Sequence, residues 1–182
     1  MASVSDLVED VSEVMGEPLE AVNAFARALI DAGDLPKSRG RAIAQVSDEE
    51  IAKLMVIVAL SPKIKDASKT LKRYWEMTPH AGGPLADVNF GTWLASMIAT
   101  MFNEAADESE RDARKAMFDH SIHLIETWPQ AEVYSCGECL IRFQHEHSLF
   151  WNAHIQRKSV ISMRAFLMLG FGKGRDYLRW TA

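Results

Sequence analysis

The sequence of 182 residues has only two cysteines and no apolar run long enough to cross a bilayer. Two cysteines cannot form the multi-bridge framework that stabilises small secreted domains. The longest apolar stretch, residues 54–60, is far shorter than the roughly 20 residues of a membrane-spanning helix. The first residues are acidic, unlike the basic start of a secretory signal. We therefore expect a cytoplasmic protein that does not associate with membranes.

The sequence also lacks the motifs that identify common catalytic and phosphate-binding sites. It contains no Gly-x-Ser-x-Gly turn, no His-Glu-x-x-His helix and no carboxylate pair in a recognisable frame. The Gly-Gly step at residues 82–83 has no Lys or Ser/Thr at the spacing of a P-loop. The six histidines have no fixed partner in the sequence. We therefore expect no enzymatic activity and no cofactor.

Hydrophobic residues make up 48% of the chain, and this content permits a sizeable core. The net charge of -5 excludes no partner, because the sign of the charge varies along the sequence. Residues 62–76 hold five basic and two acidic side chains. Two interpretations of this basic stretch stay open, a surface that contacts phosphates and an ordinary solvated helix.

The first 33 residues predict two short amphipathic helices that are separated by a tight turn. Ser5 is the expected N-cap of the first helix, and apolar residues then recur at helical spacing as far as Met15. Gly16 should end this helix, and Pro18 restarts the chain where a missing amide hydrogen costs little. Gly33 should end the second helix as a left-handed C-cap. The apolar stripe of the second helix consists of Leu19, Val22, Phe25, Ala26, Leu29 and Ile30.

The outward face of the second helix carries Asn23 and Arg27, whose side chains can read base edges. The segment after this helix adds four candidate DNA-contacting residues, Lys37, Ser38, Arg39 and Arg41. Two helices, an Ala-Gly step and a basic segment in this order resemble winged or helix-turn-helix domains, especially those of phage and prophage regulators. The resemblance covers about a quarter of the chain. It implies binding to double-stranded DNA, usually as a dimer.

The charge of this unit argues against the resemblance. Residues 1–46 hold eight acidic and four basic side chains, whereas contacts to phosphates normally supply much of the affinity for DNA. We expect a sequence-specific, DNA-binding transcriptional regulator that is associated with a phage or prophage. The alternative is a non-enzymatic protein-interaction module, such as a phage-type adaptor or an inhibitor of a host protein.

The middle of the chain predicts further helices and a linker. Ser47 and Glu50 predict a capping box before an almost continuously apolar helix. Residues 63–76 predict another helix, and residues 78–88, rich in Pro and Gly, are the expected linker. A helix rich in Met and aromatic residues should begin at residue 89. The residues expected to face inward from the helix before the linker are Ile64, Ala67, Leu71 and Trp75.

After residue 120 the hydrophobic period changes from helical to strand-like. Strands of a small antiparallel meander are predicted over residues 121–128, 131–136, 139–147 and 155–161. We therefore expect an α+β fold, with a helical N-terminal half that contains the helix-turn-helix-like unit and a C-terminal half with a small antiparallel sheet and flanking helices. The expected domains are a helical DNA-binding domain at 1–77, a linker at 78–88, and an α+β domain for dimerisation or partner binding at 89–182.

A Cys-x-x-Cys pair, Cys136 and Cys139, lies within the predicted meander. Gly137-Glu138 fits a two-residue hairpin turn of type II′, so we expect the two cysteines to face each other as small apolar residues. Zinc binding and thiol redox chemistry are the alternatives. An extended strand would carry the nearest histidines, His145 and His147, roughly 20 Å from the cysteines, so we expect no metal site.

The end of the sequence carries large apolar side chains, Tyr177, Leu178 and Trp180. Such groups are seldom left in water near a terminus, and they favour docking on a second copy of the chain. Stacking on nucleic acid is the alternative, because Gly, Lys and Arg precede them. We expect a homodimer whose contact lies in the C-terminal half.

Overall fold

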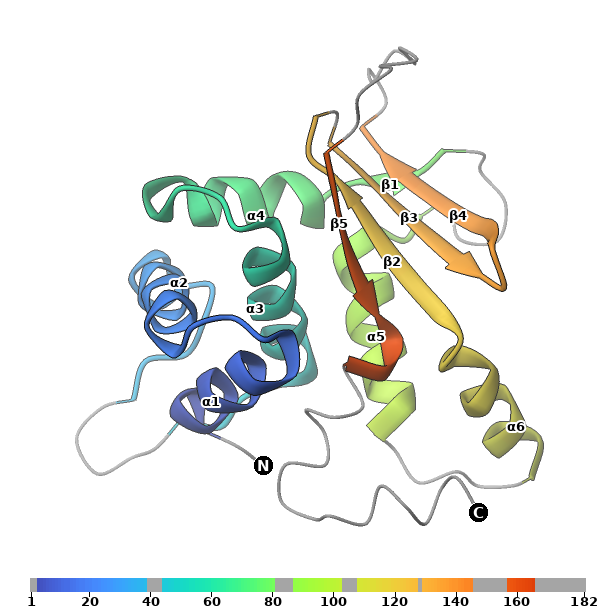
Figure 1. Cartoon of the computed structure of the whole chain (residues 1–182), viewed down its shortest axis with the longest axis horizontal. Coiled ribbons are helices and arrows are strands. Elements are labelled where there is room, and N and C mark those ends of the chain that lie inside the picture. The colour runs from blue at the N-terminus through green and yellow to red at the C-terminus, as the bar shows by residue number, and fades with distance from the viewer. Residues whose placement is uncertain are drawn as a thin grey trace.

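The computed structural model describes residues 3–38, 44–80, 87–102, 108–127, 129–145 and 157–165. The helical elements are α1 (Val4–Met15), α2 (Leu19–Ala32), α3 (Asp48–Leu60), the 3-10 helix η1 (Ile64–Asp66), α4 (Ala67–Trp75), α5 (Phe90–Phe102) and α6 (Glu108–Met117). The strands are β1 (Thr78–Pro79), β2 (His120–Ile125), β3 (Gln130–Ser135), β4 (Glu138–Gln144) and β5 (Lys158–Ser162). Helices α1 to α4 lie on one side of the molecule and the sheet on the other (Figure 1). The expected α+β fold is confirmed.

Local sequence signals explain the ends of the first helices, with one correction. The N-cap of α1 is Ser3 and not Ser5, because Asp6 lies three residues after Ser3 and completes a capping box with it. The residue three positions after Ser5 is apolar and cannot reciprocate. Gly16 and Gly33 have positive φ values of 67° and 81° and end α1 and α2, as expected.

Helix α3 is the centre of the core. Its expected capping box is present, with the Ser47 hydroxyl accepting from the Glu50 amide. Seven of its side chains are buried, which fits a helix that is apolar on nearly every face. One continuous core includes side chains from α2 and α3 as well as from α5 and the sheet, for example Leu29, Leu94 and Ile122. The division of the chain into two domains stays a prediction.

The sheet has the strand order β1-β4-β3-β2-β5, and all of its pairs are antiparallel. Strands β2, β3 and β4 form the expected meander, and β5 joins the free side of β2. Alternation along the strands points one set of side chains toward the helices, namely Ile122, Leu124, Ala131, Val133, Phe143 and Ile161. Helix α5 packs on this face, where the Phe90 and Trp93 rings lie 5.4 and 5.5 Å from the Phe143 ring.

Strand β1 begins within the segment expected to be a linker. Thr78 and Pro79 pair with Gln144 and Phe143 at the edge of the sheet. The amide of His80 continues this pairing by donating to the carbonyl of Arg142 at 2.8 Å. Residues 81–86 lie outside the described residues. Residues 78–79 carry no strand signal in the sequence. A strand of two residues is too short to show a period, and it forms here because β4 offers it a pairing edge.

Two side chains expected to be apolar anchors are exposed. Ile64 is 44% exposed because the chain begins there with a 3-10 turn, whose phase differs from that of the α-helix expected over residues 63–76. Leu19 is 49% exposed, because it lies in the first turn of α2, beyond the stripe that packs on α1. Tyr74 is the buried aromatic residue of α4, and its hydroxyl donates to the carbonyl of Ile125 at 2.7 Å.

The β3–β4 hairpin turn consists of Cys136 and Gly137, one residue before the expected position. Ser135 pairs with Glu138, and both turn residues have positive φ values, 50° and 86°. This geometry is that of a type I′ turn, whose twist matches that of the flanking strands. The expected type II′ turn at Gly137-Glu138 is therefore wrong.

Within the described ranges, no helix combines the length and the apolar character that crossing a membrane requires.

Candidate functional site

Helices α1 and α2, which carry the predicted helix-turn-helix unit, form a compact pair joined by a short turn. Three residues, Gly16 to Pro18, join the helices, and the Ser12 hydroxyl donates to the carbonyl of Glu17 at 2.7 Å across this turn. The buried side chains Leu7 and Val11 of α1 belong to the same core cluster as Phe25 and Leu29 of α2. The inner faces of both helices are therefore used for packing, and the opposite face of α2 is turned outward.

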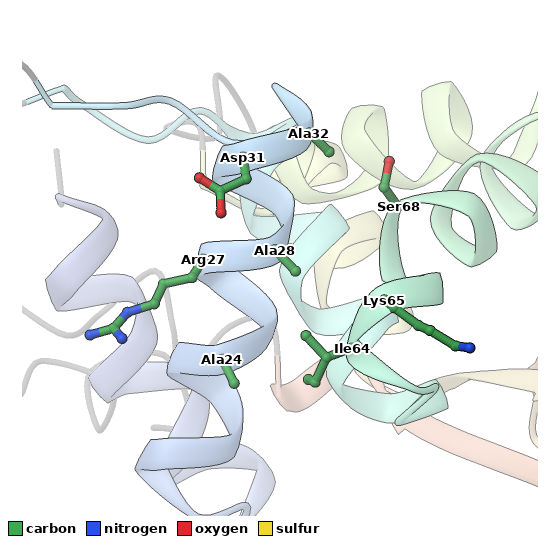
Figure 2. Close-up of a pocket in the computed structure, with 8 residues that line it drawn as sticks. All are labelled: Ala24, Arg27, Ala28, Asp31, Ala32, Ile64, Lys65 and Ser68. Carbon is green, nitrogen blue, oxygen red and sulfur yellow. The ribbon is translucent and has the colours of Figure 1, made fainter.

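The two candidate residues on α2 lie on or beside this outward face. Arg27 is exposed, and its side chain extends away from η1 and α4 (Figure 2). Asn23 lies one turn earlier and is half-buried. Glu20 and Asp31 are exposed on the same helix. This face therefore offers one cation and one amide, with two carboxylates beside them.

The segment after α2 is fixed by one buried anchor. Leu35 is 3% exposed, and its amide donates to the carbonyl of Leu29 at 3.3 Å. Lys37 and Ser38 follow and are exposed. The Ser38 hydroxyl accepts a hydrogen bond from the amide of Ala44 at 3.2 Å. Ser38 and Ala44, the two residues that flank segment 39–43, are thus joined by a hydrogen bond.

Arg39 and Arg41 lie outside the described residues. The structure therefore places four of the six predicted DNA-contacting residues, Asn23, Arg27, Lys37 and Ser38. These four come from α2 and from the segment that directly follows it.

A groove of about 470 Å³ runs between α2 and the start of α4 (Figure 2). Small side chains of α2 line one side, among them Ala24, Ala28 and Ala32, and Ile64 lies opposite them. Arg27 and Lys65 lie at the two sides of the groove and point away from each other. Residues of α2, η1 and α4 together line this groove.

The other face of the sheet carries a polar network that the sequence analysis missed. The Glu132 carboxylate is buried and accepts hydrogen bonds from Gln130 (2.6 Å), Arg142 (2.8 Å) and Tyr134 (3.1 Å). The His123 ring stacks on Tyr134 with 4.3 Å between ring centroids. Polar residues at alternate positions of β3 were the signal that could have revealed this face. Because the carboxylate is fully bonded, we interpret the network as a structural element that fixes strand register.

The electrostatic environment of this face shifts several ionisable groups. Burial, followed by the hydrogen bond to Glu132, raises the pKa of Tyr134. Burial and then the charge of Lys158 lower the pKa of His123. Burial and then the charge of Glu132 raise the pKa of the Cys139 thiol. Cys139 is thus a poorer nucleophile than an ordinary cysteine near neutral pH.

The two cysteines do not face each other across the hairpin, contrary to expectation. Cys136 lies in the turn itself, whereas Cys139 pairs with Tyr134 on the neighbouring strand, and both thiols are free and exposed. The ring of His145 bonds instead to the carbonyl of Arg73, at 2.8 Å. In the part of the chain that the structure describes, no three His, Cys, Asp or Glu side chains gather into a metal-binding group. His147 lies outside that part.

Comparisons of the sequence with protein-family models and with curated proteins, and of the structure with solved structures, found no match.

Proposed function

We propose that this chain is a cytoplasmic, sequence-specific DNA-binding regulator of transcription, and that α1 and α2 form its helix-turn-helix unit. One observation carries the proposal. The face of α2 that is turned away from the core bears Arg27, with Asn23 at its side, and this face leads past the Gly33 cap into exposed Lys37 and Ser38. Arg and Asn make bidentate hydrogen bonds to guanine and adenine edges, respectively. In this proposal α2 enters the major groove of the duplex, and exposed Lys37 neutralises a phosphate beside it.

The experiment uses the full chain and a pool of DNA duplexes with a randomised core. Repeated selection yields a preferred duplex, whose affinity is compared with that of a scrambled duplex by fluorescence anisotropy. Binding should weaken as salt rises from about 50 to about 200 mM, because phosphate contacts release counterions. Equal affinity for the two duplexes would reject sequence-specific recognition, and binding that ignores salt would reject the DNA interface.

Single substitutions assign the roles within the interface. Arg27→Ala should weaken binding to the selected duplex by about 1–3 kcal/mol and reduce the preference over the scrambled one. Replacing Arg39 and Arg41 together with Ala should weaken binding to all duplexes similarly and lower the salt slope by about two units. The matched control is Lys115→Ala on α6, a cation that is 62% exposed and lies far from α2 (Figure 1). The control should bind like the unchanged chain.

We also propose that the regulator is a homodimer joined through its C-terminal half. Strand β5 is the outer strand of the described sheet, and Val160 on it is 53% exposed. A second copy could cover this edge together with the apolar residues near Trp180, which lie outside the described part. Light scattering of the full chain and of a chain that ends at Gly172 tests this. A monomeric full chain, or a shortened chain that dimerises equally well, would refute it.

The second candidate function is a protein-interaction module. The groove between α2 and α4 favours it, because alanines and the exposed Ile64 offer an apolar surface to a partner helix. Binding through that groove would depend little on salt, and Ala28→Trp, which fills the groove, would abolish it. Salt-sensitive duplex binding that survives Ala28→Trp would favour the DNA interface.

A further inference from the structure

We propose that the exposed basic face of η1 and α4 binds the phosphate backbone of the same DNA duplex that α2 contacts. This basic face consists of Lys63, Lys65, Lys69, Lys72 and Arg73. The inference rests on the proposed function, and it identifies where the DNA interface obtains most of its positive charge.

The need for a second basic surface follows from the charge of α1 and α2. Arg27 is the only basic residue of these two helices, whereas Glu20 and Asp31 are exposed on the same helix as Arg27. Carboxylates near a phosphate backbone weaken binding by repulsion. A duplex that rested on α2 alone would therefore gain little from counterion release, which supplies much of the affinity in protein–DNA complexes.

Packing fixes the orientation of α4 so that its basic residues point outward. Ala67, Leu71 and Tyr74 are buried, and the hydroxyl of Tyr74 is bonded to the carbonyl of Ile125 in the sheet. Helical geometry then turns the opposite side of α4 to solvent. All five cations of the basic face are exposed, and within the described part of the chain none of them forms a salt bridge.

The spacing of these cations suits a linear polyanion. Lys69 and Lys72 lie three residues apart on one side of α4, and Lys65 precedes them on η1, so the three cations form a basic stripe along the two elements. The stripe is roughly 10 Å long at the rise of an α-helix. Successive phosphates of one DNA strand advance about 3.4 Å along the duplex axis, so the stripe matches about three phosphates.

The groove between α2 and the start of α4 brings the first cations of the basic face close to α2. Lys65 and Ser68 line the groove whose other side is formed by Arg27 and Asp31 (Figure 2). The Ser68 hydroxyl donates to the Asp34 carboxylate at 2.5 Å, which ties α4 to the segment that follows α2. Arg27 and Lys65 lie at opposite sides of this groove, so the proposal requires a duplex that spans the groove and contacts both sides. The alternative, a basic face that serves only solubility, predicts no effect on DNA binding.

The experiment compares the full chain with the triple variants Lys65→Ala/Lys69→Ala/Lys72→Ala and Lys65→Arg/Lys69→Arg/Lys72→Arg. Binding to the selected and the scrambled duplex is measured across a salt series. The alanine variant should bind both duplexes more weakly by the same factor, so the preference between them stays unchanged. The slope of log affinity against log salt concentration should become shallower by about 2.7, at about 0.9 per phosphate contact. The arginine variant keeps the charges and should bind like the unchanged chain. Circular dichroism and urea unfolding check that all variants are folded.

The outcomes separate this inference from the proposed function. If the alanine variant still binds selectively and salt-sensitively, with an affinity within about twofold of the unchanged chain, the basic face does not contact DNA. The proposed function of α2 would then still hold. A lost preference between the duplexes in the alanine variant would also overturn it, because phosphate contacts carry no sequence information. If the unchanged chain binds no duplex, the function and the inference both fail.

Discussion

The substitution Gly91→Ala should measure how closely the end of α4 packs against the start of α5. A Cβ atom at this position would lie 2.1–2.3 Å from three atoms of the Trp75 indole ring. Carbon atoms in contact are about 3.5–4.0 Å apart, so Gly91→Ala requires the ring or the helix to move. Trp75 is the last residue of α4, whose basic face is the proposed second DNA contact.

Two opposing terms set the magnitude. Overpacking of a well-packed site costs about 1–3 kcal/mol, and a contact this short on a rigid ring belongs at the upper end. Replacing Gly by Ala returns about 0.8–1.0 kcal/mol in a helix interior and less than that in the first turn, where Gly91 lies. We therefore expect Gly91→Ala to lower the free energy of unfolding by about 2 kcal/mol, measured by urea denaturation followed by circular dichroism.

A double-mutant cycle isolates the clash. In a Trp75→Ala background the space above Gly91 is open, so Gly91→Ala should stabilise the chain by up to about 1 kcal/mol through helix propensity alone. The sign of the effect thus reverses between the two backgrounds, which corresponds to a coupling of about 3 kcal/mol. If Gly91→Ala stabilises the unchanged chain, the close packing of Trp75 on α5 is wrong.

Three further predictions concern the sheet. Tyr74→Phe leaves the Ile125 carbonyl without its 2.7 Å donor and should lower the free energy of unfolding by about 1–3 kcal/mol in urea; an unchanged midpoint would contradict this. Because burial lowers the pKa of His123 from 6.5, the unfolded chain binds this proton more readily, and stability should fall as the pH drops below 6.5. His123→Gln should lose this part of the pH dependence between about pH 8 and about pH 5, and equal slopes for both chains would refute it. Elemental analysis of protein purified without chelator should find no stoichiometric zinc, whereas one zinc per chain would overturn the structural interpretation of Cys136 and Cys139.

Features that depend on residues a few positions apart could be predicted from the sequence. The helix end at Gly16, the left-handed cap at Gly33 and the capping box of Ser47 and Glu50 were all predicted. Each of these signals involves only one helical turn, so no distant residue can override it. The change from helical to alternating periodicity near residue 120 likewise predicted the meander, because a period reports which face of an element is buried.

Two local predictions were wrong because each segment offers two neighbouring residues, or pairs of residues, that suit the same role. Ser3 and Ser5 both suit an N-cap, and the choice depends on Asp6 as a reciprocal partner. Cys136-Gly137 and Gly137-Glu138 both suit a two-residue turn, and the twist of the strands favours the first. In each case the deciding interaction, the Asp6 carboxylate or the twist of the flanking strands, lies just outside the short pattern that gave the prediction.

The candidate site divides in the same way between sequence and tertiary structure. Residue spacing alone was enough to predict the order of helix, turn, helix and basic segment, and to predict which side of α2 is polar. Only the tertiary structure placed α4 beside α2, because that placement depends on the burial of Leu71 and Tyr74 against elements far away in the chain. Only the tertiary structure could gather Gln130 and Arg142 around Glu132, because strand register is set by cross-strand packing. Residue spacing predicts local structure such as caps and turns. The burial of apolar surface decides which elements pack together, and it does not depend on how far apart they lie in the sequence.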